Sequence, residues 1–399
     1  MTPQSSRVRL CLKDLYQQDI VEMIERETRR YELHSIEYPD HPDFERAYRV
    51  LWEGFGPAGE MEPLATIRGY LERDPFEALP SGTFIRYFLI VAKDLDGNLC
   101  GVRDGSVLYN PAYAADLCLV YLSHIFMLPE ARGTVLTYWL RVAPIELAVE
   151  HLFQLQQRRL ASLPAPDQPG RYFGMHLDLV AEMEYFSPED LQSLQRILFY
   201  GRGGFDAIDP RHFPYRQPDF RDPAAIAASR NSPTPFMLLI RRVTRERSAR
   251  LPLDEASAVM RLLYDEFACF CAPEFLQNSL DVVLRRIAER RARGRSDVAL
   301  LPLPTGPENL GRLRRLFRHD VYLRHYPDAP GTEVYLEATR KRIAENPRWY
   351  DEAIAEHGRA LAARPRTVYG SRDRRFAVDA MPALLAEPED ARTATPDDD

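Results

Sequence analysis

The sequence predicts an α/β (α+β) protein in which a strand-rich part is followed by a C-terminal all-α region. Three observations indicate this. Residues 84–93 and 99–110 are two β-rich runs separated by an Asp-Gly turn, a specific signal for a β-hairpin. Residues 117–128 read as an apolar strand that leads directly into an amphipathic helix. Beyond residue 250 the apolar side chains recur three or four positions apart, as in helices.

The N-terminal elements follow from apolar spacing. Apolar residues at helical spacing within residues 12–24 predict an amphipathic helix, which we assign to an N-terminal segment, 1–30. Residues 31–38 alternate as in a half-buried strand, and helical segments follow around residues 44–55 and 64–71.

The remaining elements complete a domain that we place at 31–250. A helix starts at about Thr134, and another strand spans residues 172–185. A second helix runs to Tyr200, and residues 235–243 form the last strand. A helical domain is expected at 251–386, and the charged, apolar-poor residues 387–399 predict a disordered acidic tail.

Composition limits the function. The 399 residues carry a formal net charge of -7, with a pI of about 5.8, which argues against nucleic acid or an anionic membrane as partner. The five cysteines are scattered, and Cys269 and Cys271 have no second ligand pair, so we predict reduced thiols and no metal site. No segment reads as a signal peptide or membrane span, so a cytoplasmic protein is expected.

The junction at residues 128–133 carries the strongest chemical signal. A strand that ends in an Arg-Gly turn and starts a helix leaves backbone N–H groups unpaired at the helix N-terminus. The peptide dipoles there also favour negative charge. This junction therefore predicts a pyrophosphate-binding turn.

The order of these elements resembles the Gcn5-related N-acetyltransferase superfamily. Three local matches carry the resemblance: Gly97-Asn98-Leu99-Cys100-Gly101, Met127-Leu128-Pro129-Glu130-Ala131-Arg132-Gly133 and Leu198-Phe199-Tyr200-Gly201-Arg202-Gly203-Gly204-Phe205. The resemblance implies a mixed, splayed sheet flanked by helices, with a cleft for the pantetheine arm of acetyl-CoA.

The resemblance also implies cofactor-binding residues. The backbone of Phe126, Met127 and Leu128 would pair with pantetheine, and the pyrophosphate turn would consist of Arg132, Gly133, Thr134 and Val135. Two registers of this degenerate turn are open. One places Val135 and Thr137 at small-residue positions, and the other starts from Leu128. A bulky Val135 is expected to crowd the phosphates and weaken binding.

Catalysis in this family needs a base for the amine and an acid for the leaving thiolate. Tyr200 stands four residues before Gly204, where the family places its general-acid tyrosine. His124 is the candidate base because its reference pKa is near neutral, and Tyr121 shares the same strand. Glu182 and Glu184 are alternatives that would act through a water.

The expected function is N-acyl transfer from acetyl-CoA or another acyl-CoA to a small-molecule amine or amino acid. Arginine runs at 285–295 and 312–319 leave open an acyl carrier protein as donor, as in N-acyl amino acid or acyl-homoserine lactone synthases. The third alternative is a non-catalytic interaction protein with the same fold.

Overall fold

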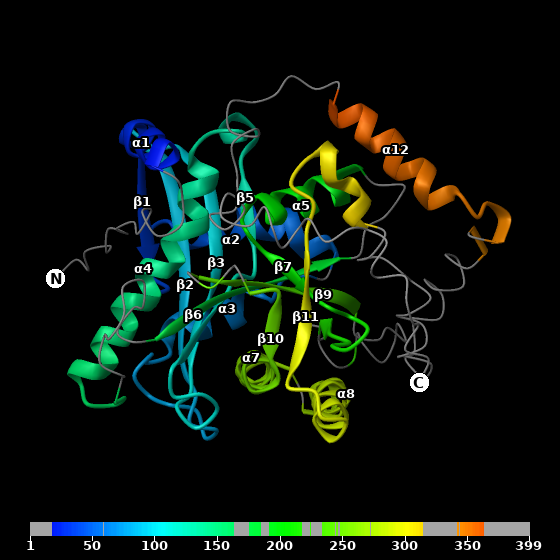
Figure 1. The fold of residues 1–399 in the computed structure, drawn as a ribbon. Helices are drawn as coiled ribbons and strands as arrows, with labels where there is room; N and C mark the ends of the chain where they lie inside the picture. The colour runs from blue at the N-terminus through cyan, green and yellow to red at the C-terminus, as the bar shows by residue number, and fades with distance from the viewer. Residues whose placement is uncertain are drawn as a thin grey trace.

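The computed structural model describes residues 18–58, 60–162, 175–184, 191–217, 224, 234–243, 245, 248–271, 273–313, 341–342 and 344–362. In these ranges the chain forms an eleven-stranded mixed sheet with helices on both faces (Figure 1). The sheet order is β1-β2-β3-β4-β6-β9-β7-β11-β10, with β5 paired to β3 and β8 to β9. The acidic tail predicted at 387–399 lies outside the described residues.

The first half of the sheet is antiparallel. Strands β1 (Tyr31–Ile36), β2 (Phe84–Asp94) and β3 (Leu99–Tyr109) pair in this order, and helices α2 (Phe44–Phe55) and α3 (Leu64–Glu72) lie between β1 and β2 in the chain. The predicted hairpin is confirmed. Gly97 turns it with a φ of +82°, and its N–H donates to the Asp94 carbonyl.

The predicted central strand is split in two. Strand β4 (Leu117–Tyr121) pairs with β3 and runs parallel to β6 (His176–Glu184). After the break, β5 (Ile125–Met127) stays with β3, whereas β6 continues along β9 (Thr234–Arg242). The sheet therefore splays between β5 and β6, as the family resemblance implies.

A glycine lies on β3 opposite the end of β4. A Cβ at Gly105 would lie 2.1 Å from the Tyr121 carbonyl oxygen, so β3 and β4 approach closely here only because the side chain is absent.

The two faces of the sheet have separate cores. The long helix α4 (Leu136–Gln157) and helix α1 (Gln18–Glu27) cover one face, where Cys118 and Val120 of β4 point. Unlike the predicted amphipathic helix, α4 is buried nearly all round, because α1 and neighbouring segments cover its outer side. Helix α5 (Leu191–Arg202) packs on the same face, and strand β7 (Asp206–Ile208) follows it.

The C-terminal region is not all-α as predicted. Strands β10 (Arg250–Pro252) and β11 (Asp297–Pro302) extend the sheet, with β11 antiparallel to β7. Helices α7 (Leu253–Phe267) and α8 (Pro273–Ala292) share a core with Leu119 and Tyr121 on the face opposite α4. The six-residue β11 was not predicted because strongly helical patterns flank it in the sequence. Among the described helices, none has both the length and the apolar character of a membrane span.

Two elements complete the description. The two-residue strand β8 (Arg216–Gln217) pairs with the start of β9. Helix α12 (Trp349–Ala362) lies beside the turn at Pro307–Arg312, away from α4 (Figure 1).

Candidate active site

One edge of β5 is open, in that no described strand pairs with it. Leu128 N donates to the Cys100 carbonyl of β3 at 3.0 Å. Because antiparallel pairing alternates, the Phe126 backbone also faces β3, whereas the backbones of Ile125 and Met127 face the side where β6 diverges. Of the three residues predicted to pair with pantetheine, only Met127 presents its backbone to this open edge.

The turn between β5 and α4 keeps some backbone N–H groups without an acceptor among the described residues. Most of its N–H groups bind acceptors within the turn: those of Ala131, Arg132, Thr134, Leu136, Thr137 and Tyr138. The N–H groups of Gly133 and Val135 have no acceptor among the described residues. Gly133 has a φ of +75°, and a Cβ there would meet nothing within 4 Å. The Val135 side chain is 1% exposed and packs in the core, away from the surface of the turn.

Arg132 connects this turn to the open edge. Its Nε donates to the Met127 carbonyl at 3.0 Å, and its guanidinium carbon lies 5.8 Å from the centre of the Phe126 ring. The side chain is exposed, so an anion bound at the turn can reach it.

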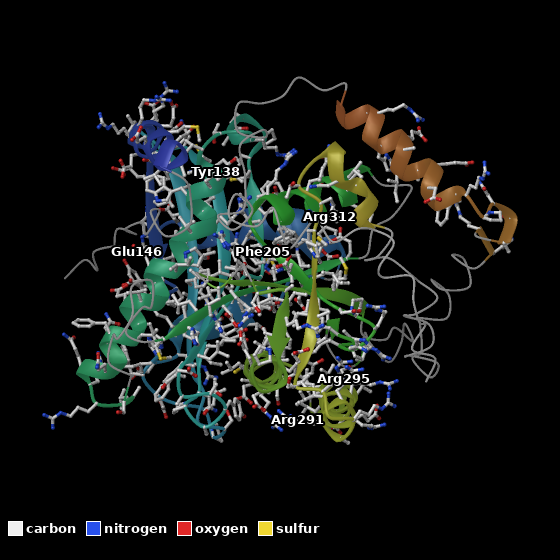
Figure 2. The ribbon with its side chains drawn as sticks, in the orientation of Figure 1. Tyr138, Glu146, Phe205, Arg291, Arg295 and Arg312 are labelled. Atoms are coloured by element: carbon white, nitrogen blue, oxygen red, sulfur yellow. The ribbon has the colours of Figure 1, made fainter. Side chains whose placement is uncertain are left out.

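Tyr200 lies near the end of α5. Its ring makes edge-to-face contacts with Phe199 at 5.3 Å and with Phe205 at 5.4 Å between centroids; Figure 2 labels Phe205. Burial raises the pKa of Tyr200, and the charge of Arg103 acts in the opposite direction. The raised pKa keeps its hydroxyl protonated at neutral pH, and no acceptor for it lies within the described ranges.

His124 lies in the break between β4 and β5 with both ring nitrogens engaged. Nδ1 is 3.0 Å from Asp104 Oδ1, and Nε2 is 2.7 Å from the Glu60 carbonyl. A carbonyl only accepts, so both nitrogens are assigned as donors and the ring as a cation. Burial lowers the pKa of His124, but the charge and hydrogen bond of Asp104 outweigh this and raise it to about 9. To act as a base, His124 would have to lose one of these contacts.

Tyr121 is bound to Glu182. Its hydroxyl donates to Glu182 Oε2 at 2.5 Å, and the same carboxylate accepts from Tyr215 and, at 3.1 Å, from Gln217 Nε2. Burial raises the pKa of Glu182, while these hydrogen bonds oppose the rise. Glu182 is half-buried, so it is the part of this polar group nearest to solvent.

Two buried carboxylates of the candidate site were not predicted from the sequence. Glu62, just before α3, is 7% exposed, and Glu266, near the end of α7, is 3% exposed. The Oε2 atom of each is buried without a hydrogen-bond partner in the described part of the chain. Burial raises the pKa of Glu62 to about 7 and that of Glu266 well above its ordinary value. Glu266 follows Leu262 and Leu263 at helical spacing, a signal that places a carboxylate on the apolar face of α7.

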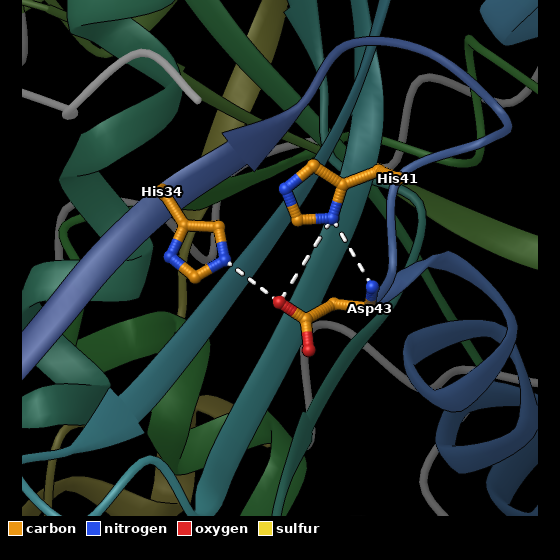
Figure 3. Close-up of side chains that lie close together, drawn as sticks. All are labelled: His34, His41 and Asp43. Carbon is orange, nitrogen blue, oxygen red and sulfur yellow. Dashed lines mark hydrogen bonds and ion pairs between the residues drawn. The ribbon is translucent and has the colours of Figure 1, made fainter. Parts of the chain in front are cut away.

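His34, His41 and Asp43 form the metal-ligand group found in the described residues (Figure 3). His34 Nε2 lies 3.2 Å from Asp43 Oδ2, and His41 Nδ1 accepts from the Asp43 N–H at 3.2 Å. Lys93 Nζ lies 2.5 Å from the same Oδ2. The ammonium already occupies the place of a cation, so this group fits an ion-pair network better than a metal site.

Two arginines of the predicted basic surface are engaged within the protein, and residues 314–319 of its second run lie outside the described residues. Arg290 donates to the Asp297 carbonyl at 2.9 Å, and Arg291 forms an ion pair with Asp254. Figure 2 places Arg291 and Arg295 at the end of α8, far from Tyr138 on α4. Nothing in these contacts favours a carrier protein as donor.

Comparisons with known proteins give distant likenesses. No family model and no curated protein matches the chain. A spermidine N-acetyltransferase from Vibrio cholerae in complex with CoA and spermine is 11% identical, covering 55% of this chain and 99% of that one, with a TM-score of 0.30. A putative acyl-CoA N-acyltransferase from Klebsiella pneumoniae is 13% identical, covering 53% and 97%, with a TM-score of 0.25. Scores this low say nothing about substrate or reaction.

Proposed function

We propose that the protein is an N-acyltransferase that moves an acyl group from acyl-CoA to the amine of a small molecule. The observation that carries the proposal is the open edge of β5 beside the start of α4. The backbones of Ile125 and Met127 would pair with the pantetheine amides. The N–H groups of Gly133 and Val135, at the N-terminus of a 22-residue helix, would bind the diphosphate.

Tyr200 is the proposed general acid. The departing thiolate needs a proton, and the Tyr200 hydroxyl has one that no described residue accepts. The rings of Phe199 and Phe205 hold the phenol in place.

Glu62 is the proposed general base, in place of His124. An ammonium cannot attack a thioester, and a carboxylate whose pKa is about 7 removes a proton at neutral pH. Glu62 takes one proton from the ammonium, and the neutral amine nitrogen then bonds to the thioester carbonyl carbon. The carbon–sulfur bond breaks as Tyr200 protonates the sulfur, and the second proton that leaves the nitrogen restores the Tyr200 hydroxyl. His124 keeps its proton and fixes the backbone beside the reacting carbonyl. These steps need no metal.

Two variants of Gly133 test the donor site. At a φ of +75°, Asn and Asp are the side chains best tolerated after glycine, and a Cβ meets nothing there. Gly133→Asp places a negative charge beside the proposed diphosphate, and Gly133→Asn has the same shape without the charge.

Calorimetric titration with acetyl-CoA measures the difference. We expect Gly133→Asp to weaken binding by more than about tenfold, and Gly133→Asn to bind nearly as the unaltered protein does. If both variants bind acetyl-CoA with equal affinity, the diphosphate does not bind at this turn. Absence of binding by the unaltered protein at millimolar acetyl-CoA would refute the proposed function.

A further inference from the structure

A hollow of about 320 Å³ lies on the face of the sheet opposite α4. Helix α7, the loop between β3 and β4, and the end of α8 all contribute to its lining. The residues from α7 lie three or four positions apart and so share one face of the helix: Asp254, Ser257, Ala258 and Arg261. The small side chains of Ser257 and Ala258, between two longer ones, leave the space open.

The hollow is remote from the open edge of β5. Its loop, at residues 110–116, follows the end of β3 at Tyr109, whereas Gly101 near the start of β3 pairs with Met127 of β5. At a rise of about 3.3 Å per residue, these two ends of β3 lie roughly 26 Å apart. A ligand in the hollow does not meet acyl-CoA, so its binding does not depend on acyl transfer.

Arg261 supplies the hollow with a cation that has no ion-pair partner among the described residues. The carboxylate one turn further along α7 belongs to Asp265, and the hydroxyls of Thr83 and Tyr113 both bind it. The Arg261 guanidinium lies over the Tyr113 ring, 5.7 Å from its centre. The side chain is exposed, and the ring positions its N–H groups without using them as hydrogen-bond donors.

The other charged groups of the hollow decide which anion suits it. Arg291, at the end of α8, forms an ion pair with Asp254, so their charges cancel and one positive charge remains (Figure 2). A carboxylate carries one negative charge and matches the planar fork of a guanidinium bidentately. A phosphate monoester carries about two negative charges at neutral pH, and Asp254 would repel the second one.

We propose that this hollow binds a small organic carboxylate, held by the Arg261 guanidinium and the Ser257 hydroxyl. Ser257 lies one turn from Arg261 on the same face of α7, and a hydroxyl can donate to a carboxylate oxygen. The carbon skeleton lies against the methyl groups of Ala112 and Ala258 and the edge of the Tyr113 ring. The volume is at the lower end of the range of small-molecule sites, about 300–1,000 Å³, and exceeds what an inorganic anion fills.

Three ligands that share a ring and differ in charge test the proposal: 4-fluorobenzoate, 4-fluorobenzamide and 4-fluorophenyl phosphate. Each is titrated with the full chain at neutral pH, and fluorine NMR of the ligand gives its affinity. We expect the benzoate to bind more than about tenfold more tightly than the amide, as charge-assisted hydrogen bonds predict, and more tightly than the phosphate. Absence of benzoate binding at millimolar concentration, equal affinity of the benzoate and the amide, or tighter binding of the phosphate overturns the proposal.

A matched pair of variants locates the carboxylate. Arg261→Gln should bring the benzoate affinity within about threefold of the amide affinity. Arg285→Gln removes an exposed arginine of α8 that does not line the hollow, and should leave the benzoate affinity unchanged. Both side chains are exposed, and equal melting temperatures check that both variants fold. Benzoate binding that is unchanged in Arg261→Gln, or weakened equally in both variants, overturns the proposal.

Competition with acetyl-CoA separates the hollow from the acyl-CoA site. We expect the same benzoate affinity with and without saturating acetyl-CoA, because the two sites lie at opposite ends of β3. Displacement of the benzoate by acetyl-CoA would place it at the open edge of β5 and overturn the hollow as its site.

Discussion

Replacing Glu62 by Gln should make the fold more stable in a pH-dependent way. Burial raises the pKa of Glu62 from an ordinary value of 4.5 to about 7, a difference of about 2.5 units, or about 3 kcal/mol. Below pH 4.5 the carboxyl is protonated in both the folded and the unfolded state and costs nothing. As the pH rises to 7, the unfolded state releases the proton first, so stability falls. Above pH 7 the full cost is present.

The assay is urea unfolding of both proteins at pH 5 and pH 8. The buried amide of Gln changes the free energy of unfolding by the same amount at both pH values. The ionisation of Glu62 is therefore measured by how the difference between the two proteins changes with pH. The cost of ionising Glu62 is about 1 kcal/mol at pH 5 and about 3 kcal/mol at pH 8, so the variant should gain about 2 kcal/mol relative to the unaltered protein between them. The exposed Glu72, changed to Gln, is the control and should gain nothing.

The same substitution bears on catalysis. Loss of a general base should lower kcat by about 10²- to 10⁴-fold and abolish a rise in rate through pH 7. A stability difference that is equal at both pH values would show that Glu62 is not a desolvated carboxyl, and the argument for it as the base would fail.

The remaining predictions concern the proposed general acid Tyr200, the close approach of β3 and β4 at Gly105, and the charge of His124. Tyr200→Phe should lower kcat by about 10²-fold or more without changing the melting temperature, and unchanged kcat would exclude Tyr200 as the acid. Gly105→Ala should lower the free energy of unfolding by about 3 kcal/mol in denaturant, because the added Cβ meets the Tyr121 carbonyl. The control Gly69→Ala, in open space on α3, should raise it by about 0.5–1 kcal/mol. Equal effects of the two substitutions would contradict the close approach of β3 and β4. His124→Gln should cost about 3 kcal/mol near pH 6, where the raised pKa stabilises the fold fully, and less at pH 10, above the folded pKa of about 9; a cost independent of pH would mean a neutral ring.

Local patterns predicted most of the fold. The Asp-Gly turn fixed the β2–β3 hairpin, and the alternation at residues 31–38 and the helical spacing at 44–55 gave β1 and α2 within two residues of their bounds. Strand β11 was not predicted, because six residues between long helices satisfy either period and only pairing with β7 decides between them.

Only part of the candidate site could be predicted from the sequence. Tyr200 and the turn at Gly133 followed from local motifs, and Ile125 was missed because the edge that a backbone presents depends on register. Glu62 and Glu266 lie 204 positions apart in the sequence, and their common environment exists only after α7 has packed across the sheet. His124 lies at a break in the strand that the sequence did not predict, and its two acceptors come from β3 and from the segment after α2, which no local pattern shows.

The position of β11 late in the chain affects how this protein folds during synthesis. Strand β7 lies between β9 and β11, and nearly ninety residues separate β7 from β11 along the chain. Until residue 302 has left the ribosome, a nascent chain therefore exposes the unpaired edge of β7, and until residue 267 has left, it also exposes the apolar surface that α7 covers. Residues 31–250 are thus not a self-sufficient unit to which a later module was attached, and a fragment ending near residue 250 would be prone to self-association.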